Sequence, residues 1–348
     1  MPIAIEGGRI PTLLKRANAL QPIAAGVSSD LGSNSLRIAL INNMPDAALE
    51  DTELQFLELL AAAALNTPVS LKLFSLPNLP RTDFGESHLR NFYFSIKDLL
   101  NDRFDGAIIT GTEPRCPNLH EEPYWRPLVQ VLDWAEINTS SSVLSCLAAH
   151  AGVLASDGIP RNPLGDKQFG VFEYQKKSSH ALTCGIGDAM WIPHSRWNEV
   201  KAESLAANGY EILTQSASAG VDLFTKEKKK SLFVHFQGHP EYNTRTLLKE
   251  YRRDIKRFLR KERETFPSSP HNYFDAAATE RLSGFQKNAM IDPREEVFAA
   301  FPEAAVALGI RNSWSDSAAV VYRNWLKYLT SKKTENRSFV AMTPVTRA

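Results

Sequence analysis

The chain has 348 residues, of which 43% are hydrophobic, and 40 Lys and Arg residues nearly balance 39 Asp and Glu, for a formal charge of +1. This length provides one large domain or two small ones, and the near-neutral charge argues against nucleic acid or an anionic membrane as a partner. The three cysteines lack metal-ligand spacing, and neither a signal peptide nor an 18-residue apolar run is present. The composition therefore predicts a soluble, cytoplasmic protein.

Strands and helices alternate in the first half of the chain. Residues 1–34 are mixed in composition and are expected to form an N-terminal arm. Apolar runs then predict buried strands at 36–41, 69–76, 105–110 and 141–145. Helical spacing follows these strands at 48–63, 91–102, 125–138 and from 147 to about 155. Such alternation with short connections predicts a parallel, doubly wound α/β sheet.

Beyond residue 160 the predicted strands are of the antiparallel kind. They lie at 170–175, 189–193, 210–215, 221–226 and 231–236, and the run "KEKKK" is expected to be a solvated hairpin or loop. A charged amphipathic helix is predicted at 244–262 and a last helix at 317–330. Between them, 264–315 is expected to be irregular, except for a helix that Asp292 caps. We expect a single domain over 35–331 and a flexible tail at 332–348.

A cysteine follows the fourth predicted strand. The stretch "SSVLSCLAAHAG" places Cys146 between that strand and a helix that begins with small residues. Reactive groups of open α/β sheets lie at the carboxyl ends of strands, and a helix N-terminus favours a thiolate. Cys146 is therefore a candidate nucleophile. A buried cysteine packed as a small apolar residue is the other interpretation of this pattern.

A histidine and a glutamate follow the strand at 231–236. In "SLFVHFQGHPEYN", Pro240 stiffens the link between His239 and Glu241, and alternation can turn both side chains to the same side. A cysteine nucleophile needs a base, and the base needs a carboxylate to orient it. His239 and Glu241 suit these roles, whereas His235, within the strand, is expected to be a packed or edge histidine.

These motifs together resemble the homoserine O-acyltransferase (transsuccinylase) family of methionine biosynthesis, which shares its core with class I glutamine amidotransferases. "SCLAAHAG" and "GHPEY" carry the resemblance, which runs from about residue 36 to 262. Collinear matches are "INNMP" (41–45), "HLRNFY" (88–93), "FDGAIITGTEP" (104–114), "DKQFGVFEY" (166–174) and "IPHSRW" (192–197). The resemblance implies a flavodoxin-like, doubly wound, mostly parallel sheet with antiparallel additions, and a homodimer.

The resemblance also implies a ping-pong acyl transfer from acyl-CoA to an amino-acid hydroxyl. Cys146 matches the cysteine that carries the acyl group as a thioester, His239 the general base, and Glu241 its orienting acid. No bound cofactor or metal is implied. The expected small-molecule partners are succinyl-CoA or acetyl-CoA as co-substrate and homoserine as acceptor, with serine as a related alternative.

Further positions match residues that contact substrates in the family. Lys167 in "DKQFGVF" matches a substrate-contacting lysine, Ser195 in "PHSR" a residue of the acceptor pocket, and Arg253 in "KEYRRD" the arginine that holds the amino-acid carboxylate. Glu250 and Arg253, at i and i+3, share a helix face and could meet the ammonium and carboxylate of an amino acid. A surface ion pair on a charged helix is the other interpretation.

Both half-reactions of such a transfer need an oxyanion hole. The backbone amides of Leu147 and of the Gly111–Thr112 turn are the candidates, with Thr112 the residue expected to donate. The sequence "TGT" after a buried strand is also compatible with a plain turn.

The chain departs from the family pattern at a few positions. Asp46 and Ala47 replace a lysine pair, which removes a cationic contact near the site. Arg115 stands where Gly accompanies succinyl donors and Glu accompanies acetyl donors. Its guanidinium could pair with a succinyl carboxylate, which favours succinyl transfer, or it could point to solvent.

The helix after the nucleophile departs as well. Leu147 and His150 replace a tryptophan and a glutamine, and His150 is either a second titratable group or a locally satisfied polar residue. The segment 275–312 is longer than the resemblance predicts and is a candidate lid or subunit contact.

Two other functions compete with acyl transfer. A glutamine amidotransferase or related cysteine hydrolase would use the same triad, but Ala148 and His150 stand where amidotransferases commonly have Gly and Gln. A non-catalytic binding protein could keep the fold, and the intact set of Cys146, His239 and Glu241 argues against it.

Overall fold

The computed structural model describes residues 3–7, 11 and 35–342, and its centre is an eight-stranded sheet. The sheet order is β1-β3-β2-β4-β5-β12-β11-β8. The first six strands are parallel, and β11 pairs antiparallel with both β12 and β8. The strands are β1 (Ile3–Ile5), β2 (Leu36–Ile41), β3 (Val69–Phe74), β4 (Gly106–Ile109), β5 (Ser141–Ser145), β8 (Glu211–Ile212), β11 (Leu223–Lys228) and β12 (Ser231–Phe236). The order β3-β2-β4-β5-β12 is that of flavodoxin-like sheets, as expected.

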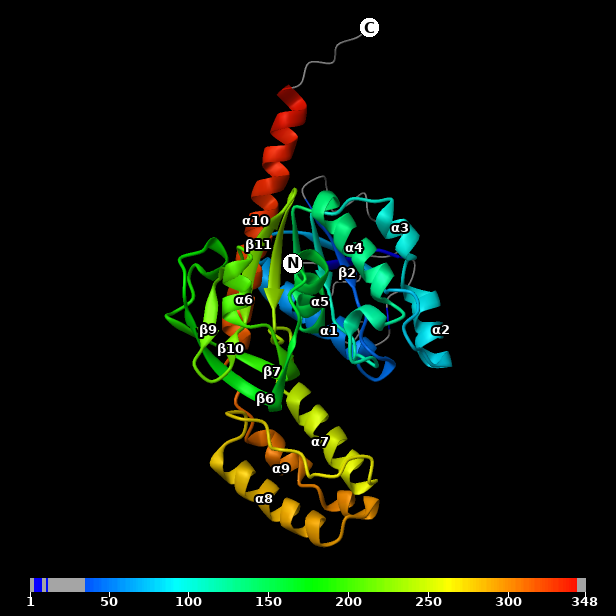
Figure 1. Ribbon diagram of the computed structural model, residues 1–348, viewed down its shortest axis with the longest axis vertical. Coiled ribbons are helices and arrows are strands. Elements are labelled where there is room, and N and C mark those ends of the chain that lie inside the picture. Colours follow the sequence, from blue (N-terminus) through cyan, green and yellow to red (C-terminus); the bar gives the residue numbers. More distant parts are fainter. Residues whose placement is uncertain (1–2, 8–10, 12–34, 343–348) are drawn as a thin grey trace.

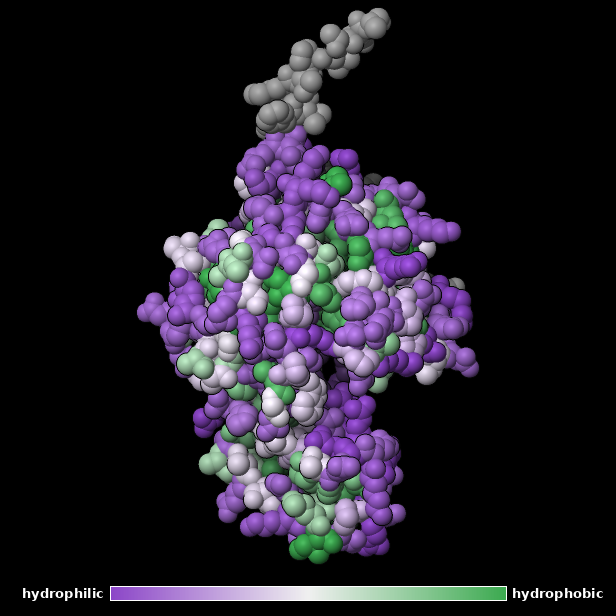
Figure 2. All heavy atoms as spheres, in the orientation of Figure 1, coloured by the Kyte–Doolittle hydropathy of each residue, from purple (hydrophilic) through white to green (hydrophobic). Residues whose placement is uncertain are grey.

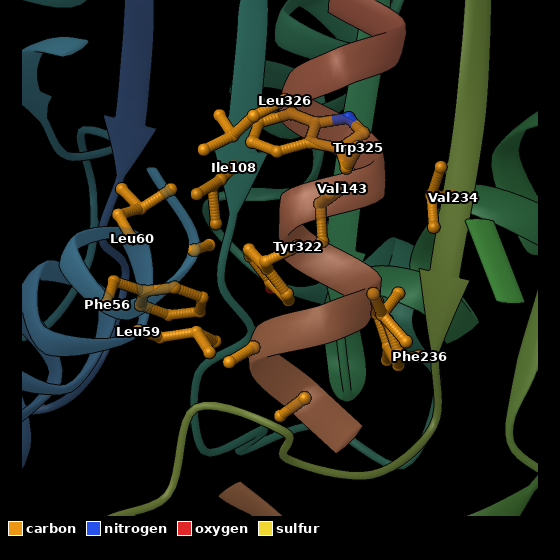
Figure 3. Packing of buried hydrophobic residues seen from close by; sticks show 14 of the residues in the cluster. Phe56, Leu59, Leu60, Ile108, Val143, Val234, Phe236, Tyr322, Trp325 and Leu326 are labelled. Atoms are coloured by element: carbon orange, nitrogen blue, oxygen red, sulfur yellow. The ribbon is translucent and has the colours of Figure 1, made fainter. Parts of the chain in front are cut away.

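Helices cover both faces of this sheet (Figure 1). On one face lie α1 (Asp46–Ala64) and α10 (Ser315–Met342). Figure 3 shows that the α10 side chains of Tyr322, Trp325 and Leu326 point toward the strands, beside side chains of α1. The strand residues that they face are Ile108, Val143, Val234 and Phe236. On the other face lie α3 (Ile96–Leu100), α4 (Trp125–Asn138) and α5 (Leu147–Asp157), with α2 (Asp83–Phe92) at the side. The doubly wound α/β prediction is therefore confirmed.

A second, four-stranded antiparallel sheet has the order β10-β9-β6-β7. Its strands are β6 (Asn162–Lys176), β7 (Ala189–Glu199), β9 (Thr214–Ser216) and β10 (Gly220–Val221). Three short helices contact other elements: η2 (Leu119–Glu121) contacts α4, η3 (Ala181–Thr183) contacts α10, and α6 (Ala202–Ala207) contacts β8. The long β6–β7 pair carries Lys167 and Ser195 toward α7 (Thr246–Leu259).

The segment predicted to be irregular is largely helical. It contains α8 (Ala276–Ile291), η4 (Glu295–Ala300) and α9 (Glu303–Leu308), which share a hydrophobic core with α7 below the main sheet in Figure 1. Asp275 caps the N-terminus of α8 by accepting the amide of Ala278. Asp292 is the C-cap of α8 and does not start a helix, because the following η4 has Arg294 as its N-cap. Figure 2 shows apolar atoms at the lower tip, where α8 ends with the exposed residues Met290 and Ile291.

Other boundaries also differ from the predictions. The helix expected at 91–102 is interrupted, because the Phe94 amide bonds to Leu73 O at the sheet and Ser95 starts α3 with a capping box. Part of the expected arm is a buried strand, β1, while 8–10 and 12–34 lie outside the described residues. The last helix continues to Met342, so the predicted end near 331 is wrong, and 343–348 also lie outside them.

Within the ranges that the structure describes, no helix is both long and apolar enough to cross a membrane.

Candidate active site

The sheet register brings three loops to one edge. Ser145, the last residue of β5, pairs with Phe236, the last residue of β12, and Ile109 at the end of β4 pairs with Leu144. Because these strands are parallel, the segments that follow them leave the sheet on the same side. The turn at Gly111, the nucleophile candidate Cys146 and the "GHPEY" segment therefore meet at this edge.

Cys146 occupies a strained turn between β5 and α5. Its φ of 52° is rare for a residue with a side chain, and its amide donates to the Phe236 carbonyl oxygen at 2.8 Å. This turn leaves the thiol partly accessible at the N-terminus of α5, where the helix dipole favours negative charge. The position suits a nucleophile, and the interpretation of Cys146 as a buried packing residue does not fit it.

His239 lies between Cys146 and Glu241. Its Nδ1 is 2.8 Å from Glu241 Oε1, its amide donates to the Pro193 carbonyl oxygen, and its ring stacks on Tyr242 with centroids 4.2 Å apart. Burial opposes the charged imidazole, but the attraction of the Cys146 sulfur and of Glu241 raises the pKa of His239 well above its ordinary value. The arrangement can hold a thiolate beside an imidazolium.

Glu241 is itself held by a neighbour. Its Oε1 also accepts a hydrogen bond from Ser145 Oγ at 3.3 Å, and the whole side chain is buried. Because Nδ1 of His239 is engaged by this carboxylate, Nε2 is the ring nitrogen left for proton transfer with the thiol.

The turn after β4 packs tightly on the start of α5. A methyl group at Gly111 would lie 2.6 Å from Leu147 Cβ and 2.9 Å from the Leu147 amide nitrogen, so only glycine fits. Among the described residues, the amides of Gly111, Thr112 and Leu147 have no hydrogen-bond acceptor. They are free to stabilise an oxyanion beside Cys146.

The predicted acceptor residues form one ionic cluster around Glu250. Glu250 accepts hydrogen bonds from Ser195 Oγ and, at 2.6 Å, from Tyr242 OH. Lys167 Nζ lies 3.7 Å and a guanidinium nitrogen of Arg253 lies 3.8 Å from Glu250 Oε2. Through Tyr242, which stacks on His239, the cluster adjoins the candidate general base.

Asp254 and Tyr242 are members of this cluster that the sequence analysis missed. Asp254 binds Lys167 Nζ and Arg253 Nε, each at 3.1 Å, and despite burial these two cations lower the pKa of its carboxyl. Arg253 remains half-exposed and is available to a ligand carboxylate. Two features of the sequence could have indicated these residues. Asp254 follows Glu250 at i+4 and so shares its helix face, and Tyr242 directly follows Glu241.

Two histidines have structural roles. His150 is buried with Nε2 2.9 Å from Gln237 Oε1, and burial lowers its pKa to about 3, so it is a locally satisfied polar residue. His235 is buried and stacks on Phe224 with centroids 4.7 Å apart, as a packed histidine was expected to do.

The departures from the family pattern have local explanations. Asp46 pairs with Arg81 at 3.0 Å, and Arg81 also donates to the Met44 carbonyl oxygen, so a cation from another segment lies at this position. The Arg115 side chain is exposed, and in the described part of the chain it forms no ion pair. Over the same part, no group of three or more His, Cys, Asp and Glu side chains is placed to hold a metal ion.

The fold is that of an α/β protein, and its site places a candidate cysteine nucleophile beside a histidine and a glutamate. The family model of homoserine O-succinyltransferases matches residues 12–336. The homoserine O-succinyltransferase of Rhodopseudomonas palustris is 42% identical over 297 residues, covering 85% of this chain and 89% of that protein. That of Methylorubrum extorquens is 39% identical over 332 residues, covering 92% and 98%.

The chain therefore belongs to the homoserine O-succinyltransferase family and is an acyltransferase, so the family resemblance of the motifs is confirmed. Among solved structures, a glutamine amidotransferase from Methylobacillus flagellatus is similar at 11% identity with a TM-score of 0.46, over 85% of this chain and 95% of that one.

Proposed function

We propose that this protein transfers the succinyl group of succinyl-CoA to the hydroxyl of homoserine through a thioester on Cys146. The observation that carries the proposal is the direct connection of two groups of residues. Cys146, His239 and Glu241 form a nucleophile with its base, and Tyr242 links them to an ionic cluster suited to an amino-acid zwitterion. Membership of the family supports the choice of donor and acceptor.

In the first half-reaction, the Cys146 thiolate attacks the carbonyl carbon of the acyl-CoA thioester. The imidazolium of His239 donates its proton to the sulfur of CoA as that carbon–sulfur bond breaks. The negative oxygen of the tetrahedral intermediate lies against the amides of Leu147 and of the Gly111–Thr112 turn. The products are free CoA and succinyl-Cys146.

In the second half-reaction, His239 removes the proton of the acceptor hydroxyl. The hydroxyl oxygen attacks the thioester carbonyl, and Cys146 leaves as the thiolate beside the new imidazolium. Arg253 holds the acceptor carboxylate and Glu250 its ammonium, while Lys167 and Ser195 maintain the charge and orientation of Glu250. Both substrates reach the same sulfur in turn, which is a ping-pong mechanism.

Mass spectrometry of the intact protein tests this mechanism. Incubation with succinyl-CoA alone should add one succinyl group to Cys146 and release one equivalent of CoA, and homoserine should then remove the label. Cys146→Ala should form no adduct and lose turnover by at least about 10³-fold. Cys184→Ala, which changes an exposed cysteine, should behave like the native protein.

The competing activities give opposite results in the same assay. Release of CoA from acetyl-CoA in preference to succinyl-CoA would overturn the choice of donor, and preference for serine would overturn the choice of acceptor. Ammonia released from glutamine without CoA dependence would indicate an amidotransferase instead.

A further inference from the structure

The segment from Gln237 to His239 leaves β12 and carries the candidate base. Each of its three backbone amides has an acceptor in a neighbouring element. The Gln237 amide donates to the Asp222 carbonyl oxygen at 3.2 Å, and the Gly238 amide to Asp222 Oδ1 at 2.7 Å. The His239 amide donates to the Pro193 carbonyl oxygen at 2.8 Å. The backbone at His239 is therefore held by residues of β7 and of the connection between β10 and β11.

The Gln237 side chain adds a second set of contacts. It is fully buried, and its two donor and two acceptor positions are all occupied. Its Nε2 donates to the carbonyl oxygens of Val200 at 3.1 Å and Val221 at 2.7 Å. Its Oε1 accepts the Val200 amide at 2.7 Å and lies 2.9 Å from His150 Nε2. Because two carbonyl oxygens face Nε2, Oε1 is the atom that meets His150.

His150 belongs to the helix that follows the candidate nucleophile. It lies at i+4 from Cys146 in α5, is 2% exposed, and its amide donates to the Cys146 carbonyl oxygen at 3.3 Å. Burial lowers the pKa of His150 to about 3, so the imidazole is neutral and carries one N–H group. Since Gln237 Oε1 can only accept a hydrogen bond, that N–H group is on Nε2 and donates to Gln237.

This hydrogen bond joins the two halves of the site. Cys146 stands at the start of α5, and Gln237 precedes the candidate base by two positions. The bond from the Cys146 amide to the Phe236 carbonyl oxygen holds the turn itself, and the His150 bond lies about one helical turn further along α5. The two bonds together fix the direction of the helix against the segment. Such precision matters, because a misplacement of about 1 Å can lower a rate by about 10²-fold.

We propose that His150 and Gln237 are positioning residues, whose hydrogen bond sets the distance between the Cys146 sulfur and the His239 imidazole. Both side chains are buried, so they act through the groups that they hold and not on a substrate. The inference rests on the proposed function, in which His239 transfers a proton in both half-reactions. Glu241 orients the imidazole ring, and the bond between His150 and Gln237 fixes the backbone that carries the ring relative to α5.

Two substitutions of His150 separate the hydrogen bond from simple packing. His150→Gln keeps an N–H donor, whereas His150→Leu fills a similar volume without one. His150→Leu should lower kcat for succinyl transfer by about 10- to 100-fold, with KM for homoserine changed less than about threefold. His150→Gln should keep kcat within about threefold of the native value.

An NMR titration of the His239 ring reports the same displacement without turnover. The Cys146 sulfur contributes to the raised pKa of His239, so a greater separation in His150→Leu should lower that pKa, whereas His150→Gln should leave it unaltered. His235→Leu is the matched control, because His235 is also buried but packs against Phe224. It should reduce stability in urea unfolding and leave kcat and the His239 titration unaltered.

Several outcomes would overturn this assignment. Native kcat in His150→Leu, or an unaltered His239 titration in that variant, would show that the hydrogen bond does not position the base. An equal loss of kcat in His150→Gln would show that the donor is not what matters. If His150→Leu does not fold, His150→Met, with a more flexible apolar side chain, replaces it in both measurements. Failure of the native protein to form succinyl-Cys146 would instead overturn the proposed function, while the His239 titration would still test the hydrogen bond.

Discussion

Cys146 shows how a single backbone conformation prepares a residue for chemistry. A positive φ in a residue with a side chain costs about 1–3 kcal/mol and persists only where the surroundings impose it. Here the Cys146 amide is held by the Phe236 carbonyl oxygen, and the thiol faces His239 at the start of α5. The strain therefore accompanies the exposure of the sulfur to a substrate.

Glu241 is predicted to position His239 and to maintain its charge. Replacing the carboxylate in Glu241→Gln removes one of the interactions that raise the pKa of His239, so that pKa should fall. The imidazolium should then persist over a narrower pH range, and kcat/KM should drop by about 10²- to 10⁴-fold. An NMR titration of the His239 ring, together with a pH–rate profile, measures both effects.

Ser145→Ala is the matched control for Glu241→Gln. It removes only the 3.3 Å hydrogen bond to the same carboxylate oxygen, so the loss of activity should stay below about tenfold. An unchanged His239 titration in Glu241→Gln would contradict the role given to this carboxylate.

At the scale of elements, α7 organises the acceptor cluster. Glu250, Arg253 and Asp254 lie at i, i+3 and i+4 and so project from one face of the helix. The strands β6 and β7 bring Lys167 and Ser195 to this face, and α8, η4 and α9 pack behind it. The segment that is longer than the family resemblance predicts thus supports the helix that carries the site.

The close contact between the turn after β4 and α5 gives a prediction at this scale. In Gly111→Ala the new methyl group would meet Leu147 and push the turn away from the α5 N-terminus, separating the proposed oxyanion donors. We expect kcat with succinyl-CoA to fall by about 10²- to 10³-fold and stability by about 1–3 kcal/mol. Steady-state kinetics and urea unfolding measure the two quantities.

Gly284→Ala provides the comparison. Gly284 is exposed in α8, and a methyl group there would meet nothing within 4 Å. Activity should be unaltered, and stability should rise by about 0.5–1 kcal/mol because alanine favours the helix. Retention of native kcat in Gly111→Ala would exclude this turn from the oxyanion hole.

At the scale of the whole molecule, a buried carboxyl connects the two sheets to the segment that carries His239. Asp222, between β10 and β11, accepts the Gly238 amide at 2.7 Å and lies 3.6 Å from His194. Burial raises the pKa of Asp222 to about 7 and lowers that of His194 well below its ordinary value. Asp222 is therefore a group whose ionisation opposes folding.

The pH dependence of stability should reveal this group. Between pH 4 and 7 the unfolded chain releases the Asp222 proton while the folded protein retains it, so the free energy of unfolding falls as pH rises. Asp222→Asn removes that decrease. The stability of the variant relative to the native protein should thus rise across this range by at most about 4 kcal/mol, measured by urea unfolding at several pH values.

Asp157→Asn is the control of opposite sign. Hydrogen bonds from Lys226, Tyr210 and Lys228 outweigh burial and lower the pKa of Asp157 to about 2. The ionised Asp157 carboxylate therefore stabilises the folded protein above the unfolded pKa near 4, and this stabilisation is lost only as pH falls toward 2. The change in the free energy of unfolding caused by Asp157→Asn should thus be constant from pH 5 to 8. A pH-independent difference for Asp222→Asn would contradict its raised pKa.

Local patterns were sufficient for much of the fold and for part of the site. The strand at 141–145 and the helix at 125–138 agree with β5 and α4, because continuous apolar runs and helical periodicity report burial directly. The helix α8 was missed because its buried positions, Ala278, Leu282, Phe285 and Ala289, are few and mixed with polar residues. Its stability depends on packing against α7 and α9.

The sequence by itself determined that a cysteine follows a buried strand, that a histidine and a glutamate follow another, and to which family the motifs are similar. Only the tertiary structure decided which groups meet. Hydrogen bonding and electrostatics over a few ångströms join Asp254 to Lys167 and Asp222 to Gly238. These partners are distant along the chain, so no local sequence pattern predicts their contacts. Burial, rather than residue type alone, determines which of these groups are charged.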